Sequence, residues 1–164
     1  MFPFIIIIFL CCFSSQSFLV AKIIEKNDLK DIQKYFDHLD QQSLVLWDVD
    51  YTLMISTDKI LLPGNEVIYS ELISSYLDQE PNQRWNELIS QIFIHSPIQL
   101  VDSKLPKIIS SLQAKGIPTL AFTAMKTGSF GLIQSMENWR INQLHQLGIN
   151  FSQLFPQYDG LNWK

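Results

Sequence analysis

The sequence predicts an α/β fold with a small parallel sheet, and three observations favour it. Two short apolar segments, 43–47 and 117–122, have the length and composition of buried strands. Between them lie segments whose apolar residues recur every three or four positions, as in amphipathic helices. A long helical connection between two strands is typical of parallel pairing. We therefore expect both strands in one sheet, with helices packed against it.

Composition limits the classes of function. A chain of 164 residues has the length of one domain, and 47% hydrophobic against 17% charged residues predicts a buried core. The net charge is −4, the pI is about 5.2, and no run of lysine or arginine is present. An acidic chain without a basic patch is a poor partner for polyanions, so we expect no binding to nucleic acid.

The beginning of the chain has the features of a signal peptide. The segment 1–13 is apolar and uncharged, and the small polar segment 14–17 follows it. We expect a signal peptide over 1–17, cleavage before Phe18 and export to the periplasm or the medium. The alternative is a membrane anchor, because apolar character continues through Ala21 and about 20 such residues can span a bilayer. Both cysteines, Cys11 and Cys12, lie in this segment, so the mature chain would form no disulfide.

Further elements are predicted from apolar periodicity, capping residues and turn residues. Asn27 or Asp28 can begin the first helix, Asp102 or Ser103 can begin the fourth, and Gly116 and Gly148 can end the fourth and fifth. Pro63-Gly64 marks a turn. The expected helices are Lys26–Leu39, Glu66–Leu77, Gln83–His95, Lys104–Lys115 and Ile133–Leu147, and 149–155 begins another element.

The first strand ends in two carboxylates. Asp48 and Asp50 are spaced i, i+2, which places both side chains on one side of a regular strand. Two like charges at one strand end repel each other unless a cation or a shared proton relieves them. Ligands of open α/β sheets also bind at the carboxyl ends of strands. The pair therefore predicts a site, and the alternative is a capping pair after an ordinary strand.

Two motifs resemble the haloacid dehalogenase (HAD) superfamily. The segment Asp48-Val49-Asp50-Tyr51-Thr52 after an apolar strand resembles its first motif, and Leu120–Thr123, much later in the chain, resembles its second. The surrounding residues, from about Leu29 to Phe155, are similar to an exported HAD-like family of unknown function from intracellular bacteria. The resemblance implies that 18–164 forms the N-terminal part of a Rossmann-like HAD core, with a helical cap-like insert at 65–97. Packing helices are the alternative for that insert.

The resemblance also implies roles for individual residues. Asp48 would attack phosphorus to form an aspartyl-phosphate, and Asp50 would be the general acid and base. Mg²⁺ would bind Asp48 and Asp50 and neutralise the oxygens of a small phosphorylated substrate. Thr123 would donate a hydrogen bond to the phosphoryl group, and Thr52 would orient the aspartates. Lys126 is near enough in sequence to contact the phosphate, although a solvent-facing turn lysine is the alternative.

Two expected parts of such a site are missing from the sequence. The superfamily also uses a lysine and a later acidic strand end, and no residue after Thr123 has either setting. We therefore expect an enzyme that is incomplete in this chain and inactive as given. The alternatives are a non-catalytic exported interaction protein and a truncated gene product, with a host protein or a missing half as partner. Beyond the signal segment we expect no stable membrane association.

Overall fold

The computed structural model describes residues 22–151, except 63, 66, 68, 69, 72–74 and 76–81. The predicted signal peptide (1–17), the turn proline Pro63 and residues 152–155 of the expected last element lie outside these residues. The described elements in chain order are α1 (Leu29–Phe36), β1 (Val45–Asp48), β2 (Met54–Ser56), the 3₁₀ helix η1 (Lys59–Leu61), α3 (Asn82–His95), β3 (Ile98–Leu100), α4 (Leu105–Ala114), β4 (Thr119–Phe122) and α5 (Met136–Gln146).

The chain divides into two compact units. The first contains residues up to Leu53, Val101–Thr123 and the chain from Gly148 onward. The second contains Met54–Leu100 and Ala124–Leu147. The predicted cap-like insert, 65–97, falls within the second unit, which also includes η1 and α5. Each unit is described below by itself.

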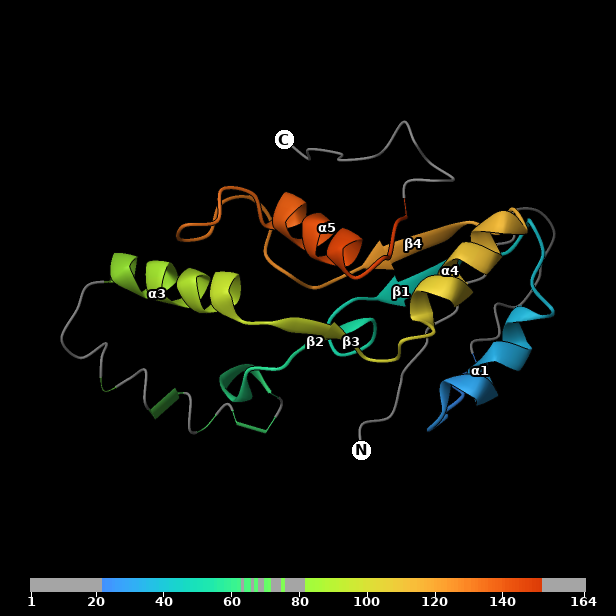
Figure 1. Cartoon of the computed structure of the whole chain (residues 1–164), viewed down its shortest axis with the longest axis horizontal. Coiled ribbons are helices and arrows are strands. Elements are labelled where there is room, and N and C mark those ends of the chain that lie inside the picture. Colours follow the sequence, from blue (N-terminus) through green and yellow to red (C-terminus); the bar gives the residue numbers. More distant parts are fainter. Residues whose placement is uncertain are drawn as a thin grey trace. The chain divides into compact units, whose positions relative to one another are not determined.

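The first unit contains a small parallel sheet, which confirms the predicted mixed α/β class. β1 pairs with β4 in parallel, in a register that places Val45 opposite Thr119 and Asp48 opposite Phe122. Figure 1 shows these two strands side by side, with α4 leading into β4. The backbone N–H of Val45 also donates to the carbonyl of Pro118, which extends the pairing by one bond. Both strands therefore end at the same edge of the sheet.

Two helices contribute buried side chains to the core of this unit. α1 buries Leu29, Ile32 and Phe36, which recur at three and four residues, and the Phe36 ring lies 5.6 Å from that of Trp47 on β1. As predicted, Asp28 caps α1, because its carboxylate accepts the N–H of Lys30 at 2.8 Å. The buried side chains contributed by α4 are Leu105, Ile108, Ile109, Leu112 and Gln113.

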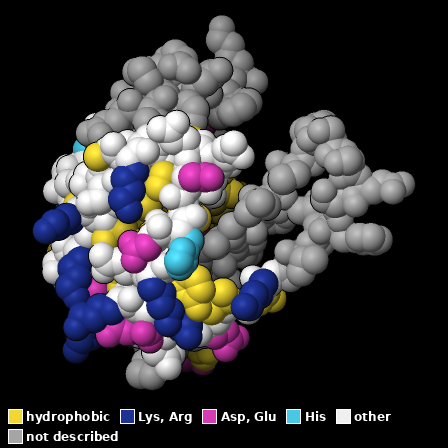
Figure 2. All heavy atoms as spheres, turned by 90° about the vertical axis from the view of Figure 1, so that its right-hand side faces the viewer, with side chains coloured by type: hydrophobic (Ala, Val, Ile, Leu, Met, Phe, Trp, Pro, Cys, Tyr) yellow, Lys and Arg dark blue, Asp and Glu magenta, His cyan; other side chains and the backbone are white. Residues whose placement is uncertain are grey.

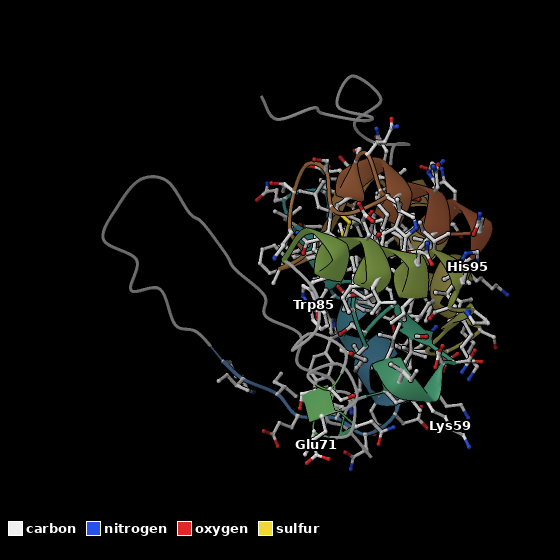
Figure 3. The ribbon with its side chains drawn as sticks, turned by 90° about the vertical axis from the view of Figure 1, so that its left-hand side faces the viewer. Lys59, Glu71, Trp85 and His95 are labelled. Carbon is white, nitrogen blue, oxygen red and sulfur yellow. The ribbon has the colours of Figure 1, made fainter. Side chains whose placement is uncertain are left out.

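The second unit contains a pair of antiparallel strands that the sequence analysis missed. β2 pairs with β3 so that Met54 lies opposite Leu100. In the same unit α3 packs on α5, where the rings of Phe93 and Trp139 stack at 5.9 Å. Figure 3 shows Trp85 and His95 toward opposite ends of α3 and Lys59 on η1.

Several predicted helix boundaries differ from those in the structure. α4 begins after Lys104, which makes no capping bond through its side chain, whereas the Asp102 carboxylate accepts the N–H of Lys104 at 2.8 Å. α5 begins later than predicted, at Met136, because Ser135 is its cap and Ile133 forms a bridge with Phe130. In the expected helix Glu66–Leu77 only a few residues are described, and Val67, Ser70, Glu71 and Ser75 are helical.

Candidate active site

The predicted aspartates lie at the carboxyl end of the parallel strand pair. Asp48 is the last residue of β1, and Thr123 follows the last residue of β4. The N–H of Val49 donates to the carbonyl of Phe122 at 3.1 Å, so the two strands stay paired up to the point where the acidic segment begins. Two segments that are far apart in the sequence are thereby held together at one sheet edge.

Burial alternates along the acidic segment and orients its carboxylates. Val49 and Leu53 are both 0% exposed, whereas Asp48 is exposed and Asp50 is half-buried. The N–H of Leu53 donates to the carbonyl of Val49 at 3.0 Å and closes a turn over the segment. Because the side chain of Val49 is buried in the core, the side chains of Asp48 and Asp50 project away from the core, as their i, i+2 spacing predicts.

The backbone after Asp50 is strained. Tyr51 has a φ of 62°, and among the described residues no other non-glycine residue has a positive φ. This left-handed conformation is unfavourable for a side chain with a Cβ and persists where the surrounding structure enforces it, often at functional sites. Here the buried anchors on both sides, Val49 and Leu53, enforce it. The sequence carries no signal for this feature, because tyrosine has no preference for that region.

Two threonine hydroxyls fix the aspartates. Thr52 Oγ1 donates to Asp48 Oδ2 at 3.1 Å, and Thr123 Oγ1 donates to Asp50 Oδ2 at 2.9 Å. The structure therefore brings together Asp48, Asp50, Thr52 and Thr123, four of the five residues that the sequence analysis selected. The bond from Thr52 to Asp48 is the contact that its predicted orienting role requires, and the role itself stays a prediction. Thr123 contacts Asp50, a bond that the sequence analysis did not anticipate.

The fifth predicted residue, Lys126, belongs to the second unit. Its Nζ lies 5.3 Å from the centroid of the Phe130 ring in that unit. A cation over an aromatic ring is a stabilising arrangement of its own and requires no phosphate. The role of Lys126 in phosphate binding stays a prediction.

The donor set of the site suits a hard cation. Within the described ranges no group of three or more His, Cys, Asp or Glu side chains could hold a metal ion. The oxygens of Asp48 and Asp50 nevertheless fit Mg²⁺, which is commonly bound by one or two carboxylates and completes its shell with water and substrate oxygens. Two hydrogen-bonded carboxylates at a solvent-accessible strand end can thus hold a cation and offer a nucleophilic oxygen.

Comparison with known proteins places the chain in a family. The family model described as "Protein of unknown function (DUF2608)" matches residues 25–164. The chain belongs to the DUF2608 family. No curated protein and no solved structure matches it significantly.

This result corrects the assignment to the HAD superfamily. The model that matches is that of DUF2608, and no HAD family model matches. The resemblance depended on two short segments, Asp48–Thr52 and Leu120–Thr123, which specify polar residues at two neighbouring strand ends. Polar residues at two neighbouring strand ends can form an acidic site on any parallel sheet, so they do not determine the rest of the fold.

Helices that could span a membrane can be sought only in the described part of the DUF2608 chain. Between residues 22 and 151, where described, no helix is long and apolar enough to cross a bilayer. The segment for which we predict a signal peptide, 1–17, lies outside these residues. Export stays a prediction.

Proposed function

We propose that this protein is a Mg²⁺-dependent phosphohydrolase, incomplete in this chain, that acts on a small phosphorylated substrate through an aspartyl-phosphate on Asp48. The observation that best supports it is the hydrogen-bonded set at the strand ends. Thr52 holds Oδ2 of Asp48, and Thr123 holds Oδ2 of Asp50. Preorganised carboxylates of this kind need no reorganisation during reaction, and such preorganisation is a major source of rate enhancement.

The proposed reaction has two steps. In the first, Oδ1 of Asp48 attacks phosphorus, the bond from phosphorus to the ester oxygen breaks, and protonated Asp50 gives its proton to that oxygen. In the second, Asp50 takes a proton from water, the resulting hydroxide attacks phosphorus, and the bond to Asp48 breaks. Inorganic phosphate leaves, and both aspartates return to their initial states. Oδ1 is the proposed attacking atom because Thr52 already donates to Oδ2.

Asp48 would hold the cation through its carboxylate and Asp50 through its backbone carbonyl, because the side chain of Asp50 carries the proton that is transferred. When bound, Mg²⁺ supplies positive charge that offsets the carboxylates and the phosphoryl oxygens. Thr52 keeps the Asp48 carboxylate in one orientation, and Thr123 does the same for Asp50. We also propose that the β1–β4 pair is the centre of a Rossmann-like core, since ligands of such sheets bind at the carboxyl ends of the strands.

Covalent capture tests the nucleophile separately from turnover. The chain is incubated with Mg²⁺ and acetyl phosphate, and peptides are analysed by mass spectrometry. We expect one phosphoryl group on the peptide that contains Asp48, removable by hydroxylamine and absent in Asp48→Asn. In Asp50→Asn the adduct should persist, because loss of a general base slows hydrolysis by about 10²–10⁴-fold.

The matched control is Asp40→Asn, which changes an exposed carboxylate of the same unit that accepts the N–H of Gln42. This variant should form and lose the adduct like the unchanged chain. An equal amount of adduct in Asp48→Asn would exclude Asp48 as nucleophile. If the unchanged chain and Asp40→Asn both failed to become phosphorylated, with or without Mg²⁺, a non-catalytic interaction protein would be favoured instead.

A further inference from the structure

A cavity of about 360 Å³ lies between α1 and α4 in the first unit. Its floor is apolar, formed by Phe36 from α1 and by Ile108 and Leu112 from α4, all of them buried. This volume is at the lower end of the range of small-molecule sites, about 300–1,000 Å³. Neither Asp48 nor Asp50 lines it, so the cavity is separate from the candidate active site.

The rim of the cavity is basic. Lys104, Lys107 and Lys115 line it, against a single carboxylate, that of Asp37. Within the described part of the chain these lysines form no ion pair. The excess of positive charge is local, because the whole chain has a formal net charge of −4. Figure 2 views the molecule from the side on which α1 and α4 lie, and shows many basic side chains on this face with acidic ones among them.

The lysines are unevenly placed along α4. Lys104 and Lys107 are one helical turn apart at the amino end, where the helix dipole also favours negative charge. Lys115 follows the last turn, about 12 Å from Lys107 and about 16 Å from Lys104 along the helix at 1.5 Å per residue. Ile108 and Leu112 lie between the two ends. The cavity thus has a cationic end, an apolar middle and a second lysine at the far end.

We infer that this cavity binds an amphipathic anion, with a carboxylate or phosphate head group between Lys104 and Lys107. The apolar part of the ligand lies against Phe36, Ile108 and Leu112. An inorganic anion would leave the floor exposed to water, and a neutral apolar molecule would leave the lysines without partners. A ligand that carries both parts satisfies both surfaces. This inference does not depend on the proposed phosphohydrolase activity.

Calorimetry with the whole chain in detergent-free buffer tests the ligand class. Decanoate and decyl phosphate, kept below the concentrations at which they aggregate, are compared with decanol, decyltrimethylammonium and inorganic phosphate. We expect saturable binding of either or both of the first two, which also shows which head group is preferred, and binding at least tenfold weaker of the other three. Equal affinity for decanol or decyltrimethylammonium would overturn the inference.

Two pairs of variants test the location. Lys104→Gln with Lys107→Gln should weaken binding by about tenfold or more, since two charge-assisted contacts are lost. The control, Lys30→Gln with Lys34→Gln, removes the same charge from exposed positions of α1 that do not line the cavity, and should bind normally. Equal affinity of the two double variants would refute the head-group position.

The second pair fills the cavity. Ser110 and Ser111 are both exposed and both donate to the carbonyl of Lys107, at 3.0 and 2.7 Å, but only Ser111 lines the cavity. Ser111→Phe should therefore abolish binding, whereas Ser110→Phe should leave it unchanged. Thermal unfolding of each variant without ligand identifies any loss of folding. Binding by a folded Ser111→Phe variant as strong as by Ser110→Phe would exclude this cavity.

Discussion

A methyl group added at Gly131 should strongly destabilise the protein, whereas the same group at Gly128 should not. Both glycines belong to the second unit and have positive φ, 55° and 78°. A Cβ at Gly128 would meet nothing within 4 Å, so Gly128→Ala carries only the backbone cost of about 1–2 kcal/mol. A Cβ at Gly131 would overlap the carbonyl oxygen of Asn86 and the hydroxyl of Ser90.

The extra cost at Gly131 has two sources. Asn86 contributes backbone of α3, which cannot rotate away, and overpacking of this kind costs about 1–3 kcal/mol. Ser90 is 0% exposed, donates to the carbonyl of Glu87 and accepts the N–H of Leu132 at 2.8 Å. Displacing this hydroxyl leaves buried polar groups without partners, at about 1–3 kcal/mol. Gly131→Ala should therefore lose about 2 kcal/mol or more beyond Gly128→Ala.

Urea unfolding of the whole chain, followed by far-ultraviolet circular dichroism, measures both losses. The difference in free energy of unfolding between the two variants isolates the steric and hydrogen-bonding terms, because the backbone cost is common to both. Equal losses would show that α3 and the 128–135 loop do not approach each other as described.

Three further predictions concern pH, the core and export. The pKa of Glu137 lies below its usual 4.5, chiefly because its carboxylate accepts backbone N–H bonds from its own amide and from Gly128. The contribution of Glu137 to stability is therefore present above pH 4.5 and is lost as the pH falls through the lowered pKa. Glu137→Gln should flatten the acid limb of a plot of stability against pH, and an unchanged limb would contradict the assignment. The buried side chain of Gln113 donates to Thr119 Oγ1 and to the carbonyl of Asn150. Gln113→Met should therefore lower the free energy of unfolding in urea by about 1–3 kcal/mol. An unchanged free energy of unfolding would show that neither bond contributes to stability. If the signal peptide is cleaved, mass spectrometry of the native protein should find an N-terminus near Phe18 outside the cytoplasm, and a soluble cytoplasmic form that retains Met1 would refute export.

Local features of the fold were predictable from the sequence because their causes are local. The apolar face of α1 and its cap at Asp28 depend on residues within a few positions of one another. The β1–β4 pair was predictable because both strands are continuous apolar runs and a helical crossover favours parallel pairing. The clustering of Asp48, Asp50 and Thr123 followed directly, since parallel strands end at one sheet edge.

Other features depend on distant partners. β2 and β3 are very short and pair across the whole of η1 and α3, so neither has enough periodicity to be recognised as a strand. The strained backbone of Tyr51 is imposed by burial on both sides of it, and the hydroxyl of Thr123 reaches Asp50 only once the sheet has formed. The assignment to the HAD superfamily was wrong for a related reason, because the two short motifs behind it describe strand ends and not a whole chain.

The discontinuity of the two units has a consequence for synthesis. Each unit is assembled from separate stretches of chain, and the boundaries fall after Leu53, Leu100, Thr123 and Leu147. When β1 has been synthesised, neither unit is therefore complete. The second unit waits for α5, and the first waits for Ile149, which is 1% exposed. Until then apolar surface of both units stays uncovered, so the nascent chain should depend on chaperones until Ile149 has emerged.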